Sequence, residues 1–357
     1  MFDEKDFTFD HFLLISQFLT PAECQMMYTM NKKLNAWKNK KLWCKKFIFG
    51  KPSDQPPVES WPRFNMAEIV CIAGDYPSTK FETFTHVRGF KIFNNNDFEL
   101  MPKKIKPERM EFVDCNNLDM NNIWAMDVML VNCDISKQEI VHEKKMRNLT
   151  ISFGTQPKAI KATLKTELFK LWHATVTINE DSEIDKLSFN DVLFTIPECV
   201  LSKVQSVRFH DVQNAPSTYA SAKKIKIECT PLTNGFHSNR ACKKLTMRNV
   251  HVNGCFEVPN ASTIILENVK WEQAKKQDSM ENKMDILHLI NCSHGDFSMF
   301  RGVKRVRIVG CCHCDLSTLG FLEEIILVDS GLVSAADFKS RANGCVRKFQ
   351  GNYQIIH

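Results

Sequence analysis

A short phrase recurs along the chain at nearly constant spacing, and this repeat constrains the fold more than any other feature. Its clearest copy is Leu245-Thr-Met-Arg-Asn-Val250, in which two apolar residues flank a variable one, and a second variable residue, an Asn or Asp and a small apolar residue follow. We take the second apolar residue of each copy as its anchor. The clearest anchors are Phe189, Phe209, Ile227, Met247, Leu266, Leu289, Ile308 and Leu327. Such regular recurrence, once in roughly 20 residues, indicates a repeat array.

Looser copies of the phrase precede this series at similar spacing. Their anchors are Ile92, Phe112, Leu130 and Ile151. The next step, from Ile151 to Phe189, is twice as long as the others, so one repeat is distorted. Within it, residues 157–172 predict a helix, because apolar residues recur at helical spacing, and residues 174–178 predict a strand. We expect the array to be least regular around residues 155–182. The apolar residues of the expected helix are Ile160, Leu164, Leu168 and Leu171.

The phrase itself predicts a strand, because apolar and variable residues alternate along it. Strands that recur in the same direction at a nearly constant interval stack in parallel. About 14 residues then remain for each return, which allows a short helix, a turn or an extended segment. The small residue at the end of the phrase is expected to turn inward beneath the strand. That position holds Cys115, Cys133, Val192, Val212, Val250, Val269, Cys292 and Cys311.

This pattern resembles the leucine-rich repeat, Leu-x-Leu-x-x-(Asn or Cys), over roughly residues 85 to 350. The resemblance implies an α/β fold, a solenoid with a parallel β-sheet on its concave face. We place the solenoid at residues 85–357 and a Pro-rich linker and entry to the array at 51–84. The linker assignment rests on the prolines between Gly50 and Pro62, which disfavour a regular element.

The first 50 residues predict a separate domain of short helices. Their features resemble an F-box in order: an Ile15-x-x-Phe18-Leu19 phrase, a Pro21-Ala-Glu turn, a basic polar stretch and a closing Leu42-Trp43. The family's leading Leu-Pro is absent, and Leu34 stands where the family has its mid-motif Trp. The family implies contact with an adaptor protein through Phe12, Ile15, Leu19, Pro21, Leu42 and Trp43. A helical cap on the solenoid is the alternative interpretation.

An F-box followed by leucine-rich repeats resembles the substrate-recognition subunits of cullin–RING ubiquitin ligases. The resemblance implies that the partners are the F-box-binding adaptor, a cullin and a substrate protein, and that the chain is neither an enzyme nor a cofactor carrier. Alternatives are a repeat scaffold without a ligase role and a nucleic-acid-binding solenoid. The expected substrate contacts are the variable residues beside the anchors: Arg208, His210, Arg248, His288 and Arg307.

The Asn or Asp that follows each anchor at the second position has two interpretations. These side chains initiate the turn through bonds to the backbone, or they form a polar column that touches a partner. The turn role is the one we favour. The column includes Asn94, Asp114, Asn132, Asp191, Asp211, Asn249, Asn268, Asn291 and Asp329.

Composition narrows the classes further. A net charge of +6 is modest for 357 residues, and 41 acidic residues balance the basic pairs before the strands, so nucleic acid is a less favoured partner. The N-terminus does not resemble a signal peptide, and no apolar run reaches membrane-spanning length, so we expect a cytoplasmic or nuclear protein with reduced cysteines. Cys311-Cys-His-Cys314 is expected to be repeat core and turn, because contiguous ligands point to alternate faces of a strand.

Overall fold

The computed structural model describes most of the repeat array and a few residues before it. The described residues are 15, 23, 46–49, 68–74, 84, 87–96, 107–123, 125–135, 139–154, 157–238, 242–258, 261–276, 284–292, 300, 302–311, 319, 322–330, 333–334, 346–350 and 355–356. The chain divides into two compact units, residues 1–160 and residues 161–357.

The first unit contains a parallel sheet of consecutive strands. In order across the sheet these are β1 (Lys46–Phe49), β2 (Ile69–Ala73), β3 (Gly89–Phe93), β4 (Arg109–Val113), β5 (Asp127–Val131) and β6 (Glu139–Ser152). A short 3₁₀-helix, η4 (Met120–Asn122), lies between β4 and β5 in the sequence.

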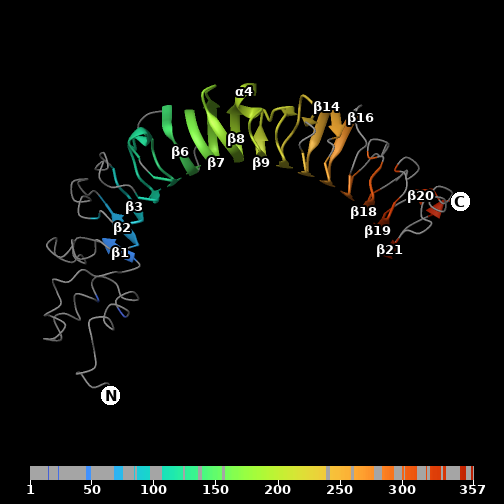
Figure 1. Cartoon of the computed structure of the whole chain (residues 1–357), viewed down its shortest axis with the longest axis horizontal. Coiled ribbons are helices and arrows are strands. Elements are labelled where there is room, and N and C mark those ends of the chain that lie inside the picture. The colour runs from blue at the N-terminus through green and yellow to red at the C-terminus, as the bar shows by residue number, and fades with distance from the viewer. Residues whose placement is uncertain are drawn as a thin grey trace, which may run out of the picture. The chain divides into compact units, whose positions relative to one another are not determined.

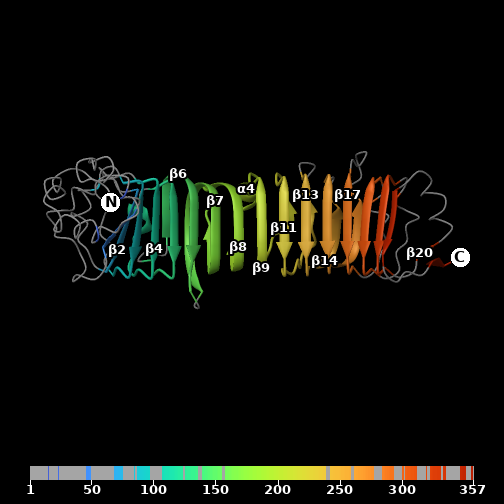
Figure 2. The same ribbon diagram turned by 90° about the horizontal axis from the view of Figure 1, so that it is seen from below.

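The second unit is built around a longer parallel sheet (Figure 2). Its strands, in spatial order, are β7 (Lys158–Ile178), β8 (Glu183–Thr195), β9 (Ser206–Gln213), β11 (Lys224–Glu228), β13 (Lys244–Arg248), β15 (Thr263–Glu267), β17 (Ile286–Ile290), β18 (Arg305–Val309), β19 (Glu324–Val328) and β21 (Val346–Gln350). Figure 2 shows β11, β13 and β17 along one sheet and pointing the same way.

The anchors of the repeat pair with one another across the strands. In the second unit Phe209 is opposite Ile227, and Met247 is opposite Leu266. The same register holds for every step from Phe189 to Leu327, so the prediction of one parallel sheet through these anchors is confirmed. All eight anchors are at most 2% exposed. Stacked apolar side chains from successive strands therefore form a continuous core.

The distorted repeat corrects the sequence analysis. Residues 158–178 form the strand β7, not a helix over 157–172, and Leu171 is the missing anchor, opposite Phe189. The helical pattern arose because the inward alternation changes phase within the strand. It runs through Leu164 and Thr166, is interrupted at Leu168, which is only half-buried, and resumes at Phe169. In each stretch every second residue points inward. Joining two such stretches with a change of phase places apolar residues three or four positions apart, as in a helix.

The α/β class is also corrected, because the returns between strands contain very little helix. The short α4 (Glu198–Leu201) is the only α-helix whose bounds fall within the described residues. Within the described residues, three small parallel sheets occupy other returns. They pair β10 (Thr218–Tyr219) with β12 (His237–Ser238), β14 (His251–Val258) with β16 (Lys270–Lys276), and β20 (Val333–Ser334) with β22 (Ile355–Ile356). Figure 1 shows β14 and β16 side by side and separate from the main sheet. The architecture is a mostly parallel β-solenoid.

Aromatic side chains explain why these returns are extended. Tyr219, Phe236, Phe256 and Trp271 come from successive returns and form a row of tilted ring contacts, with centroids 5.5, 5.6 and 5.8 Å apart. Strands keep equivalent residues of neighbouring repeats in register, so each ring contacts the next. This row forms the wall of the core opposite the anchors of the second unit.

The sheet begins earlier than the sequence predicts. β1 falls within residues 1–50, which were expected to be helical, and β2 falls within the expected linker. β1 pairs in parallel with β2, and β2 with β3. The helical prediction is therefore wrong for residues 46–49. The rest of the expected helical domain lies outside the described residues, except for Ile15 and Glu23, which are both helical.

Candidate functional site

The Asn or Asp at the second position after an anchor bends the chain, just past the strand in most repeats and within β8 and β9 at Asp191 and Asp211. It has a positive φ in almost every repeat, from 43° at Asp329 to 54° at Asn132. Left-handed backbone is costly for most L-residues, and Asn, Asp and Gly tolerate it best. Its N–H still bonds to the next strand, as Asn268 N–H does to the Ile290 carbonyl at 2.8 Å. These residues therefore turn the chain through their backbone conformation, whereas the Asn268 side chain bonds to Asn249 of the neighbouring repeat and not to the backbone.

The next residue points inward, as predicted. All eight Cys and Val residues at this position are at most 3% exposed. Where it is Cys, Ser or Thr, the side chain donates to a carbonyl at the end of its own strand: Cys133 Sγ to Val131 at 3.3 Å, and Thr230 Oγ1 to Glu228 at 2.9 Å. The residue with positive φ between the carbonyl and the donor, Asn132 or Cys229 in these two cases, brings the two groups together. The position therefore selects small side chains that are apolar or can donate to this carbonyl.

Two pairs of these cysteines are stacked in neighbouring repeats. The Cys115 thiol raises the pKa of Cys133, and the Cys311 thiol raises that of Cys292, with burial adding to both shifts. Burial raises the pKa of the separate Cys242 to about 11. The raised pKa values favour the protonated thiol at Cys133, Cys242 and Cys292, which suits their buried core positions.

The predicted substrate contacts all lie on one face. Arg208, His210, Arg248, His288 and Arg307 alternate with buried anchors, so they project from the second unit's sheet on its outward face, the side away from the core. The structure separates them into two groups, one on β9 and β13 and one on β17 and β18.

The first group is a network of charges. Arg248 reaches Glu228 on one neighbouring strand at 3.5 Å and Glu267 on the other at 2.9 Å, while Lys226 lies 2.7 Å from Glu228. Burial raises the pKa of Glu228. The hydrogen bond from Lys226 and the charges of Lys226, Arg248 and Arg208 outweigh burial and hold that pKa below its usual value. These basic groups are partly neutralised within the sheet.

The second group sits among apolar side chains. His288 pairs across the strands with Arg307. Burial, followed by the charges of Arg307 and Lys244, lowers the pKa of His288, so the imidazole is neutral at pH 7. Around this pair, five half-buried branched side chains project from the outward face and form what we call the apolar patch. It consists of Ile265, Ile290, Val309, Ile326 and Val328.

The apolar patch was not predicted from the sequence, although the sequence contains a signal for it. Strands that alternate strictly should carry polar residues on a solvent face. The copies Ile264-Ile-Leu-Glu and Ile325-Ile-Leu-Val instead have apolar residues at the variable positions too. Reading those positions in neighbouring repeats together would have identified an apolar surface.

The predicted adaptor contacts are not assembled by the structure. Phe12, Leu19, Pro21, Leu42 and Trp43 lie outside the described residues. Ile15 is described, is helical and is 41% exposed. Its exposure is compatible with a contact surface and also with a solvated helix.

The described residues also bear on metal-binding and membrane-spanning classes of protein. Among them, no group of three or more His, Cys, Asp or Glu side chains could hold a metal ion. Cys311 is buried at the end of β18, and residues 312–314 are not among the described ones. In the described part of the chain, no helix has the length and apolar content to cross a membrane.

Comparison with known proteins does not show a family for this chain. No family model matches the sequence, and no curated protein matches it significantly. Functional conclusions therefore depend on the residues and geometry described above.

Proposed function

We propose that this protein is a recognition module that binds a partner protein through the outward face of its second unit. The observation that carries the proposal is the apolar patch, five branched side chains that project away from the core on four neighbouring strands. Apolar surface that gathers on one face, rimmed by polar groups, is typical of protein interaction sites.

The patch has the composition of an interface centre. Arg307 lies within it, and the network around Arg248 and Glu228 lies beside it. Apolar side chains and Arg are enriched in the buried centre of interfaces, and paired charges suit a hydrated rim. Full burial of an exposed Val or Ile stabilises by roughly 1.5–3 kcal/mol. Five half-buried ones can therefore supply a substantial part of a binding free energy.

We propose further that the partner is a substrate and that residues 1–50 attach the module to a ubiquitin ligase. The support is the resemblance of Ile15 to Leu19, Pro21 and Leu42-Trp43 to an F-box, followed directly by a solenoid. In this role the protein performs no chemistry. It raises the effective concentration of the bound substrate near the ubiquitin-charged enzyme.

The adaptor interaction is tested by a pull-down with the purified F-box adaptor and a cullin. The full chain is compared with a deletion of residues 1–44, which keeps β1, and with a Leu19→Ala, Pro21→Ala double variant. The proposal expects both variants to lose the adaptor while the array melts at the parent temperature. Absence of adaptor binding by the full chain would refute the ligase role. Loss of array stability on deletion would instead support the helical cap.

The recognition face is tested separately. Ile290→Glu places a charge in the apolar patch, and Leu193→Glu is the matched control, because Leu193 is 37% exposed on β8, away from the patch. Affinity purification of each variant from cells should lose a specific partner only with Ile290→Glu. Equal recovery of every partner with both variants would contradict a role for the patch.

A further inference from the structure

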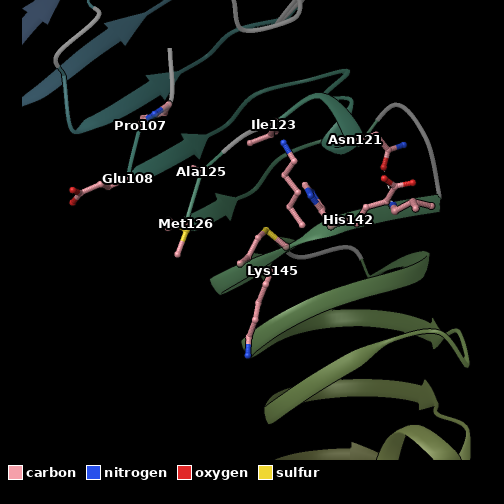
Figure 3. Close-up of a pocket in the computed structure, with 12 residues that line it drawn as sticks. Pro107, Glu108, Asn121, Ile123, Ala125, Met126, His142 and Lys145 are labelled. Carbon is pink, nitrogen blue, oxygen red and sulfur yellow. Dashed lines mark hydrogen bonds between the residues drawn. The ribbon is translucent and has the colours of Figure 1, made fainter. Parts of the chain in front are cut away.

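A cleft in the first unit is separate from the outward face of the second. β5 pairs with β6 only from Asn148 to Ser152, so the first part of β6 extends past the beginning of β5. The segment that follows η4, including Ile123, Ala125 and Met126, faces this extension across a cleft of about 620 Å³. Figure 3 shows Ile123, Ala125 and Met126 along one side, with His142 and Lys145 on β6.

The lining of the cleft is mainly apolar, with charges among the remaining groups. Met126 and Val141 are exposed at 48% and 39%, which is unusual for large apolar side chains. Pro107, Ile123 and Met146 extend the apolar wall. Ligand pockets typically measure about 300–1,000 Å³ and combine an apolar lining with a few placed polar groups. This cleft has the size and lining of such a pocket.

His142 supplies a buried polar group within the lining. Its side chain is on the inward side of β6 and only 8% exposed, yet its Nε2 has no hydrogen-bond partner. A hydrogen bond to the Met120 backbone raises the pKa of His142, and because Nε2 has no partner we assign this bond to Nδ1. Burial lowers the pKa of His142 despite this bond, so the ring is neutral at pH 7. With Nδ1–H donating to Met120, the unpartnered Nε2 carries a lone pair and is an acceptor.

A buried acceptor without a donor costs free energy, and native proteins satisfy nearly all such groups. A molecule in the cleft can satisfy this one only if it brings an O–H or N–H. We propose that the cleft binds a small, mainly apolar molecule whose hydroxyl or N–H donates a hydrogen bond to His142 Nε2. The apolar body of the ligand lies against Ile123, Met126 and Val141.

The test uses two probes that differ in the donor and in one methyl group. Naphthol has an aromatic body and a hydroxyl donor, whereas its methyl ether has the same body and no donor. Isothermal titration of the full chain should show that naphthol binds and that the ether binds about fivefold to tenfold more weakly, the worth of one hydrogen bond. In the same samples, the ¹⁵N resonance of His142 Nε2 should shift with naphthol and not with the ether.

Variants locate the site. Met126→Trp fills the mouth of the cleft from an exposed position and should abolish binding without affecting folding. His142→Phe removes the acceptor and should make the two probes bind equally. The control is His251→Phe, because His251 is an exposed histidine on β14 and should leave both affinities unchanged. Equal binding of the two probes to the parent protein, binding that survives Met126→Trp, or no binding of either probe would each overturn the proposal.

Discussion

The left-handed position at the strand end offers the sharpest test of the repeat. Asn268 has φ 51°, its N–H bonds to the Ile290 carbonyl at 2.8 Å, and its Nδ2 donates to Asn249 Oδ1 at 2.8 Å. In Asn268→Val, a β-branched residue must adopt this backbone, which costs roughly 1–2 kcal/mol. The lost side-chain bond adds about 0.5–1.5 kcal/mol. Asn268→Gly loses the same bond but avoids the steric cost.

The assay is hydrogen–deuterium exchange of β15 and β17 in the full chain. A decrease of roughly 1–2 kcal/mol in the free energy of local opening makes the opened state about 5–30 times more populated. Amides in Asn268→Val should therefore exchange faster than those in Asn268→Gly by about that factor. Asn190→Val is the matched control, because Asn190 is half-buried on β8 and is not among the residues with positive φ. Valine is favoured in a strand, so this variant should stay protected. Equal exchange in the two valine variants would refute the reasoning.

Three further predictions concern the core. Met247→Asp places an unpaired charge at a fully buried anchor, costs several kcal/mol and should unfold the neighbouring repeats, whereas Lys244→Asp, at an exposed position, should melt near the parent. Mass spectrometry of native protein should find Cys115 and Cys133 as thiols, and a disulfide at either would overturn the core assignment. His142 has a folded-state pKa below 6.5, so the unfolded state binds more protons as the pH falls through 6.5. The unfolding free energy should therefore drop below that pH, and His142→Phe should flatten the drop.

The sequence predicted the parts of the fold that depend on strict repetition. Spacing alone identified the anchors, their parallel register and the inward Cys or Val, because every copy must meet the same neighbours above and below. The sequence also predicted that Asn268 and its equivalents turn the chain, but through side-chain bonds to the backbone, whereas the structure shows a left-handed backbone there. These features are local or periodic, so the sequence contains them directly.

The errors came from features that the repeat does not define. The apolar residues Leu164, Leu168 and Leu171 fit a helix because β7 changes its inward phase, which sequence spacing cannot distinguish from a helical period. The extended returns depend on contacts of Phe236 and Phe256 with neighbouring rings, which join one repeat to the next. The α/β class failed for this reason.

The role of the predicted contact residues stays a prediction, and the structure shows only where they lie. The outward positions of Arg208 and Arg307 followed from alternation, but their different surroundings, a charge network for one and the apolar patch for the other, depend on pairing across strands. The cleft at His142 was not predicted, because it arises where β6 extends beyond β5. Residue types in the sequence do not indicate where one strand extends past its neighbour.

The central claim, recognition through the outward face, is tested most directly by site-specific photo-cross-linking in cells. A photoreactive amino acid is introduced at Val309, within the apolar patch, and at Glu180, a turn residue of the same unit outside it. The account predicts a discrete cross-linked protein at Val309, absent at Glu180 and lost from Val309 when Ile290→Glu is added. No cross-link at Val309, or the same products from both positions, would contradict it.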